Sequence, residues 1–313
     1  MFLRFLPALL TLLAAAGATA APAKLHADHP LSYTLWDTRA DRPIDEAELF
    51  ARAIAARWVL VGEKHDNAAH HALQARVVEA LGRSGRSYAV VWEMAEPEQS
   101  QALEEAELES VEELGDALDW EARGWPSWAE YRPIAEAALR HGLPMRPGKP
   151  SRALVRRLSQ GEGLPADLAG RLAWQRPYPA GVEEALRKEL RESHCGLLPE
   201  AALGGMLKVQ RLWDAWMADS MLAAAADGAE GAVLIAGSGH VREDRAVPWH
   251  LGGRGGGDAL TLALVEVAAG SLAARDYAAF DRTLFDFVWF TPRVDEDDPC
   301  EPLRARPADP PAD

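Results

Sequence analysis

The sequence predicts an α/β fold, in which a mainly parallel sheet is flanked by helices and a smaller helical subdomain is inserted. Three continuous apolar runs, at 58–62, 88–92 and 232–236, predict strands that are buried on both faces. Each run ends abruptly in polar residues, and helical patterns separate the runs. Because strands that alternate with helices pair in parallel, the carboxyl ends of all three should lie at one edge of the sheet.

The remaining elements are assigned from the spacing of apolar residues and from capping residues. Further strands are expected at 33–37, 143–147, 260–267 and 285–290. Helices are expected at 45–57, 67–81, 128–141, 151–159 and 205–226, with a shorter one after Pro97. Asp45 is the candidate N-cap of the first helix, and Asp66 or Asn67 that of the second. The segments 41–45 and 240–250 are expected to form a turn and a loop.

The chain divides into three parts by composition. Residues 1–20 are typical of a signal peptide, with an apolar stretch after Arg4 and a small-residue cleavage site at the end. Residues 21–292 are expected to form the α/β domain, with a helical insertion at about 150–205 that shows no strand pattern. Residues 293–313 are rich in proline and acidic side chains, which predicts disorder.

The signal peptide predicts export to the periplasm. It contains no cysteine and hence no lipobox, and no later stretch of apolar residues is long enough to predict a membrane span. The formal net charge of -15 argues against nucleic-acid binding, which needs a basic surface. Cys195 and Cys300 could form a disulfide in an oxidising compartment, although their spacing does not show that they meet.

Carboxylates and histidines follow all three buried strands. Glu63 and His65 follow the first strand, Glu93 the second and His240 the third. Carboxylate and imidazole are ligands for zinc or manganese, so a metal site assembled from separate strands is one interpretation. The alternative is structural, with these residues capping helices and binding loop amides.

The same corner could instead bind an anionic ligand. Lys64 supplies a cation, and His70 or His71 adds a donor in the first turn of the next helix, whose amino terminus attracts carboxylates and phosphates. Covalent haem attachment is excluded because no CxxCH motif occurs. Non-covalent haem needs an axial donor, and Tyr131 and Tyr178 are candidates.

Several short motifs occur in order between residues 33 and 251. They are Gly62-Glu63-Lys64-His65-Asp66-Asn67 with His70-His71, Val91-Trp92-Glu93-Met94, Trp128-x-x-Tyr131-x-Pro133-Ile134, Gln210-x-x-Trp213-Asp214 and Gly237-x-Gly239-His240-Val241-Arg242. Together these motifs resemble the ChaN-like haem-binding uptake family. That family looks like a branch of a superfamily with the Tiki metalloproteases and the erythromycin esterase-like proteins.

The resemblance implies an α/β domain with a smaller helical domain, and haem held by a tyrosine at a homodimer interface. Carried over to this chain, it makes Tyr131 the expected axial ligand. Lys64 and His71 are expected to contact the propionates, and His65 and His240 are further haem-site candidates. The metal ligands of the hydrolase relatives look like four positions of this chain: Glu63, His65, Glu93 and His240.

The leading hypothesis is therefore a periplasmic haem-binding protein for haem or iron uptake or storage, which captures haem and works with components of a haem-uptake receptor. The alternative is a metal-dependent hydrolase of the same superfamily, in which zinc or manganese activates water. A third hypothesis is an interaction module for an outer-membrane receptor, which would bind neither haem nor metal.

Overall fold

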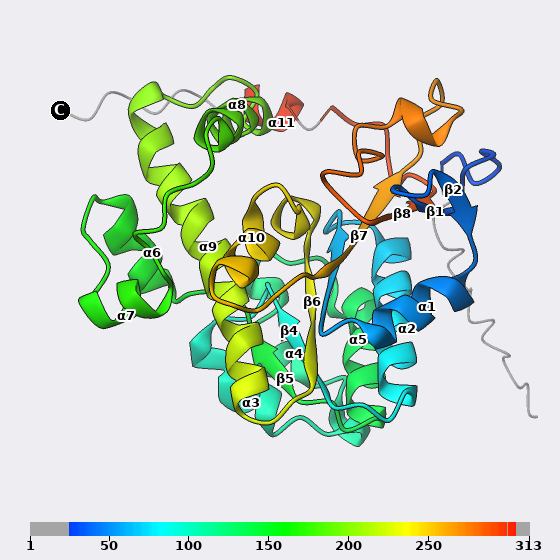
Figure 1. The fold of residues 1–313 in the computed structure, drawn as a ribbon, viewed down its shortest axis with the longest axis horizontal. Coiled ribbons are helices and arrows are strands. Elements are labelled where there is room, and N and C mark those ends of the chain that lie inside the picture. The colour runs from blue at the N-terminus through cyan, green and yellow to red at the C-terminus, as the bar shows by residue number, and fades with distance from the viewer. Residues whose placement is uncertain (1–24, 299, 305–313) are drawn as a thin grey trace, which may run out of the picture.

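The computed structural model describes residues 25–298 and 300–304, and eight strands of that part form one sheet (Figure 1). The strand order is β2-β1-β8-β7-β3-β6-β4-β5. The strands are β1 (Leu35–Asp37), β2 (Arg42–Ile44), β3 (Trp58–Glu63), β4 (Tyr88–Trp92), β5 (Met145–Pro147), β6 (Gly231–Gly237), β7 (Leu260–Glu266) and β8 (Phe287–Thr291). Only the pairs β1–β2 and β1–β8 are antiparallel among them. The predicted mainly parallel α/β fold is confirmed.

Helices cover both faces of this sheet. The α-helices of the described residues are α1 (Glu46–Ala55), α2 (Ala68–Arg83), α3 (Ser100–Glu104), α4 (Leu114–Ala117), α5 (Trp128–Arg140), α6 (Arg152–Ser159), α7 (Ala166–Arg171), α8 (Val182–Ser193), α9 (Glu200–Ala226), α10 (Ala246–Gly253) and α11 (Glu301–Arg304). Helices α1, α2 and α5 lie on one face, and α9 and α10 on the other (Figure 1). Short 3-10 helices join some elements, among them η4 (Ser238–Val241) after β6.

Strand β3 shows how a continuous apolar run serves both faces. All of its residues are buried. Val59 and Val61 belong to the apolar core beneath α1, α2 and α5, whereas Trp58 and Leu60 belong to the core beneath α9 and α10. Successive side chains of a strand point to opposite faces, so such a strand needs apolar residues at every position. Because β6 and β7 flank β3, Glu63 is held near the middle of the sheet edge.

The two predicted helix caps are resolved by their hydrogen bonds. Asp45 caps α1 because its side chain accepts the backbone N–H of Glu48. Asn67, rather than Asp66, caps α2 and accepts the backbone N–H of Ala69. The α2 helix therefore starts immediately after the polar loop that follows β3.

Two predicted connections are wrong, for local reasons. The predicted turn at 41–45 contains β2, because its backbone pairs with β1 at the edge of the sheet. The predicted loop at 240–250 contains η4 and α10. Pro248 does not prevent this helix, because it stands in the first turn of α10, where the backbone N–H groups have no partner within the helix.

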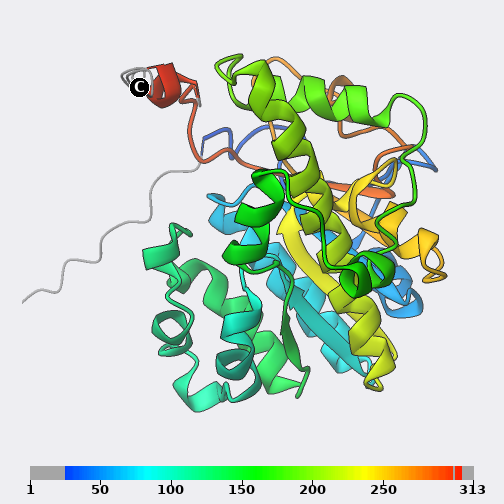
Figure 2. The same cartoon turned by 90° about the vertical axis from the view of Figure 1, so that its left-hand side faces the viewer.

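The segment expected as a helical insertion, at about 150–205, contains α6, α7 and α8. These helices lie along α9 rather than on the sheet (Figure 2), and a small separate apolar core that includes Leu158 and Leu212 joins part of them to α9. Helix α9 begins at Glu200 rather than at 205. Its additional first turn contains Leu203, which is fully buried.

The two ends of the described chain are joined to the rest by specific contacts. Leu25 pairs with Arg293 in an antiparallel bridge. We expected disorder from residue 293 onward; in the described part of that segment, Cys300 forms a disulfide with Cys195, with Cα atoms 5.6 Å apart. The predicted signal peptide at 1–20 and the end of the predicted tail lie outside the described residues. No helix among the described residues has the length and apolar character of a membrane span.

Candidate functional site

The polar residues that follow β3, β4 and β6 meet at one edge of the sheet. Strand β6 pairs in parallel with both β3 and β4, and Glu63 lies opposite Gly237 in this register. Glu93 follows β4 directly, and its backbone N–H donates to β6 at 3.0 Å. His240 lies on η4, just beyond the end of β6. The structure thus brings Glu63, His65, Glu93 and His240 together, as expected from the carboxyl-edge rule.

Glu63 is the buried centre of this group. Its Oε1 accepts hydrogen bonds from His65 Nδ1 at 2.8 Å and from the Tyr131 hydroxyl at 2.7 Å. Its Oε2 lies 3.1 Å from His71 Nε2. Burial alone would raise the pKa of Glu63, but the hydrogen bonds from His65 and His71 outweigh it and lower that pKa. Glu63 is therefore ionised and holds three rings in place.

Glu93 lies between His65 and His240. Its Oε2 accepts the backbone N–H of Gly237 at 2.7 Å and lies 3.7 Å from His65 Nε2, and its Oε1 lies 3.5 Å from His240 Nε2. His240 Nδ1 in turn lies 2.6 Å from Asp214 Oδ1. Burial lowers the pKa of His240, but the carboxylates of Glu93 and Asp214 raise it to about 10. His240 is therefore a cation between two carboxylates at neutral pH.

Tyr131 and His71 lie beneath this edge. Both side chains are fully buried, and their ring centroids are 3.7 Å apart. Burial and the neighbouring Glu63 carboxylate raise the pKa of Tyr131, which disfavours the tyrosinate that an axial ligand would require. In this arrangement neither the expected axial ligand nor the expected propionate contact at His71 is open to a ligand.

Lys64, the other expected propionate contact, already has acidic partners. Its Nζ lies 3.1 Å from Asp66, 3.5 Å from Glu266 and 3.7 Å from Asp295. Burial lowers the pKa of Lys64, but these carboxylates raise it further than burial lowers it. Since three carboxylates compensate its charge, Lys64 offers little attraction to another anion.

Two tryptophans and a lysine form the rim of the site. The Trp125 ring lies 5.1 Å from the His65 ring, and the Trp213 ring lies 6.0 Å from the His240 ring. Lys149 places Nζ between these indoles, 5.0 Å from the centre of Trp125 and 4.4 Å from that of Trp213. We call Trp125 and Trp213 the indole pair. His65 is the accessible histidine beside it, with 35% of its side chain exposed against 9% for His240.

One cavity adjoins the indole pair, and another adjoins the two histidines. The basic cavity, of about 310 Å³, is lined by the indole pair and by Lys149, Arg123, Arg152, Arg156 and Glu96, among others. The second cavity, of about 280 Å³, lies between helix α8 and the histidines His65 and His240. The site can therefore be approached from two sides, with the rings of His65 and Trp125 between them.

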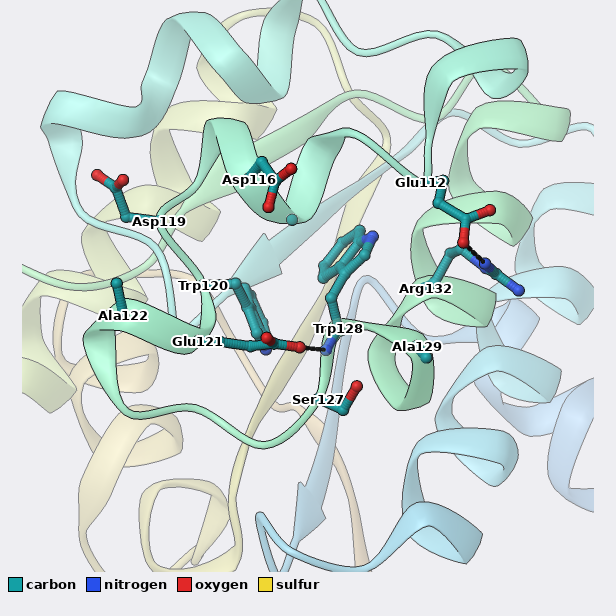
Figure 3. Close-up of a pocket in the computed structure, with 11 residues that line it drawn as sticks. Glu112, Asp116, Asp119, Trp120, Glu121, Ala122, Ser127, Trp128, Ala129 and Arg132 are labelled. Carbon is teal, nitrogen blue, oxygen red and sulfur yellow. Dashed lines mark hydrogen bonds and ion pairs between the residues drawn. The ribbon is translucent and has the colours of Figure 1, made fainter. Parts of the chain in front are cut away.

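A further cavity has the opposite charge (Figure 3). It measures about 470 Å³ and is lined by Glu112, Asp116, Asp119 and Glu121, together with the edges of two tryptophans. The one basic residue of its lining, Arg132, is paired with Glu112 at 3.0 Å. An anionic ligand is expected to avoid this cavity, because uncompensated carboxylates repel it.

The predicted zinc or manganese centre receives no support from the geometry. Within 25–298 and 300–304, no group of three or more histidine, cysteine, aspartate or glutamate side chains is placed to hold a metal ion. Instead, Glu63 accepts hydrogen bonds from Tyr131 and His65, and Glu93 accepts one from the backbone of Gly237. The predicted ligands converge, but as a chain of ion pairs.

Three residues of the site were not assigned a role in it from the sequence, although a feature of the sequence points to each of them. Lys149 lies two residues after the end of the short strand β5, near the same edge of the sheet as Glu93, which follows β4 directly. Asp214 is an acid within the apolar stripe of α9, and a buried carboxylate requires a partner. Trp125 belongs to a tryptophan-rich segment, but the pattern does not show which ring faces the site.

Gly62 is needed because η4 packs against β3. A Cβ atom at this position would lie 2.8 Å from the Cα of Ser238 and 2.5 Å from a methyl group of Val241. Gly62→Ala should therefore reduce the free energy of unfolding by about 1–3 kcal/mol, measured by urea denaturation. Gly204→Ala is the control, because open space surrounds Gly204 in helix α9 and alanine should be neutral or stabilising there. Equal stability of Gly62→Ala and the wild type would contradict this close packing.

Comparisons with known proteins agree with this geometry at the level of the fold. A family model described as haem-binding uptake, Tiki superfamily, ChaN matches residues 49–251. A structure described as cofacial haem binding to ChaN of Campylobacter jejuni is similar, with a TM-score of 0.63, 20% identity, and coverage of 82% of this chain and 95% of that one. A mutant of the erythromycin esterase EreC in its open conformation has a TM-score of 0.48 and 13% identity, with coverage of 86% and 99%. No curated protein matches the sequence.

Proposed function

This chain belongs to the ChaN family of haem-binding uptake proteins in the Tiki superfamily. We therefore propose that it binds haem non-covalently. The observation that carries the proposal is the rim of the site. A partly exposed imidazole, His65, contacts Trp125, and a lysine lies between this indole ring and that of Trp213. Haem needs these three things: a donor for its iron, apolar faces for its ring and cations for its propionates.

His65 is the proposed donor to the haem iron. Its Nδ1 lies 2.8 Å from Glu63 and can donate its proton there, and Nε2, 3.7 Å from Glu93, becomes the electron-pair donor when the ring loses its second proton on binding iron. Histidines that bind metals usually donate their other N–H to a carboxylate in this way, which fixes the orientation of the ring. Tyr131, which also donates to Glu63, is then a positioning residue that holds the carboxylate in place.

Titration of the wild-type protein with hemin should give a saturable Soret band. His65→Ala should weaken hemin binding by roughly 10- to 100-fold and change the band, because the iron loses its protein donor. Tyr131→Phe should retain the band with a modest shift, since the buried hydroxyl acts only through Glu63. Absorption spectra and dissociation constants of the three proteins provide the measurement.

His26→Ala is the matched control. Like His65, His26 is partly exposed and paired with a carboxylate, that of Glu296, at 2.9 Å. A wild-type protein that gives no Soret band would refute haem binding altogether. An unchanged spectrum of His65→Ala would show that another residue is the donor to the iron. Loss of the band in Tyr131→Phe would identify Tyr131 as that donor.

We further propose that haem binding serves uptake or storage in the periplasm, after export directed by residues 1–20. The supports are the family assignment and the sequence pattern of the first twenty residues. Cell fractionation tests the location. The homodimer expected from the resemblance is tested by the molar mass in solution with and without hemin, and receptor components by co-purification from the periplasm.

A further inference from the structure

We propose that the basic cavity around Lys149 is an anion subsite that takes the propionate carboxylates of haem. This inference rests on the proposed function and adds the part of the site that recognises the charged edge of the ligand. It also moves the expected propionate contacts from Lys64 and His71 to a different strand end.

The first argument is the balance of charge in the basic cavity. Four basic residues line it, and Glu96 is its one carboxylate. Glu96 is already paired with Arg123 and, at 3.2 Å, with Arg152. Within the part of the chain that the structure describes, no carboxylate lies within ion-pair distance of Lys149 or Arg156. In a chain of formal net charge -15, two uncompensated cations in one cavity favour an anionic ligand.

The second argument is the way Lys149 is held. Its backbone N–H donates to the carbonyl of Ala95 at 2.9 Å, and the N–H of Gly148 donates to that of Trp92 at 2.7 Å. A Cβ atom at Gly148 would lie 2.8 Å from the same Trp92 carbonyl, so the backbone passes close against β4. The ammonium group is thus fixed between the indole pair rather than free in solvent.

The third argument is that the cation is partly removed from water without an acid to offset it. Burial lowers the pKa of Lys149, and the more distant carboxylates of Glu93 and Glu96 compensate only in part. A ligand carboxylate next to Nζ would compensate the charge directly. The charge of Lys64, in contrast, is already compensated by three carboxylates within 3.7 Å.

The fourth argument is position. Trp125 lines the basic cavity and also contacts His65, the proposed iron donor, with ring centroids 5.1 Å apart. Trp213 lines the same cavity and contacts His240. A ligand whose flat apolar body lies on the indole pair would therefore have its charged edge at Lys149, on the rim that also carries His65. The acidic cavity in Figure 3 has the wrong charge for that edge.

The test compares hemin with hemin dimethyl ester, in which both carboxylates are masked. Lys149→Met removes the charge but keeps an apolar stem between the indole pair, and Arg156→Ala removes an exposed cation of the same cavity. Each variant should weaken hemin binding by roughly tenfold, the effect of losing a charge-assisted hydrogen bond. Binding of the dimethyl ester should change little. The Soret band and the quenching of tryptophan fluorescence give two independent dissociation constants.

Arg157→Ala is the matched control. Arg157 lies next to Arg156 on helix α6, but it does not line the basic cavity and is paired with Glu162 at 2.7 Å. It should bind hemin as the wild type does. If both variants weaken hemin and its ester equally, or weaken neither, the anion subsite is refuted while haem binding stands. If the wild type binds neither compound, the proposed function fails, and the subsite with it.

Discussion

Lowering the pH from about 7 to about 4.5 should reduce the free energy of unfolding by about 5 kcal/mol. Two buried histidines, His70 and His250, have their pKa lowered from 6.5 to about 3 in the fold, chiefly by burial. Between these values the unfolded chain binds more protons than the folded chain. Each histidine therefore costs about 1.4 kcal/mol per pH unit as the pH falls below 6.5.

The contacts of His70 explain why it cannot be charged in place. Its Nδ1 accepts the backbone N–H of Lys64 at 2.9 Å, and its Nε2 lies 2.8 Å from the hydroxyl of Thr291. A proton on Nδ1 would break the first of these hydrogen bonds and leave a cation in a fully buried position. Because Lys64 lies in the loop that carries His65, acid unfolding should begin beside the functional site.

His250 allows the effect to be isolated. Its ring is buried against Trp249, and its Nε2 has no hydrogen-bond partner among the described residues. His250→Phe keeps the aromatic volume and removes the proton site, so it should halve the loss of stability between pH 6.5 and 4.5. Urea unfolding curves at several pH values measure this slope. A variant that loses stability with pH as steeply as the wild type would show that His250 does not contribute.

His240 acts in the opposite pH range. Its pKa is raised to about 10, because Glu93 and Asp214 outweigh the effect of burial. Its contribution to stability is therefore complete below about pH 6.5 and is lost as the pH rises toward 10. The protein should be most stable close to neutral pH, where His240 is charged while His70 and His250 are neutral.

The convergence of the site was predictable because it depends on a rule that is local to each strand. A buried apolar run that stops at a polar residue marks the carboxyl end of a parallel strand, and such ends share one edge. This places Glu63, Glu93 and His240 together without any knowledge of side-chain packing. The rule also covers Lys149, because the strand expected at 143–147 is confirmed as β5, but Gly148 and Lys149 after it carry no carboxylate or histidine to mark them as site residues.

The orientation of the helical residues was not predictable in the same way. Tyr131 lies on α5, and the choice between a buried and an exposed hydroxyl depends on how α5 packs against α2 and on the stacked ring of His71. Likewise, two of the three partners of Lys64 come from β7 and from the segment after β8, which are remote in the sequence. Tertiary contacts therefore decide which of the candidate ligand contacts remain accessible.

Replacement of both Cys195 and Cys300 by serine should lower the free energy of unfolding by about 2–4 kcal/mol. The disulfide joins residues that are 105 positions apart, so it restricts a long loop in the unfolded chain. Urea unfolding of the oxidised wild type, the reduced wild type and the double variant measures the effect. The reduced wild type and the double variant should coincide, and a reductant should leave the double variant unchanged.

The same change should make His65 more accessible, because the disulfide holds the helix that covers the second cavity. Helix α8 lines that cavity through Leu186 and Glu189, and it ends just before Cys195. Two ion pairs also hold α8, one between Glu189 and the buried Arg245 and one between Arg191 and Glu200. Diethyl pyrocarbonate should therefore modify His65 faster in the double cysteine variant than in the oxidised wild type. Glu189→Ala, which removes only the ion pair with Arg245, gives the comparison for the loss of one non-covalent contact. Equal rates of modification in oxidised and reduced wild type would mean that the disulfide does not help to hold α8 over His65.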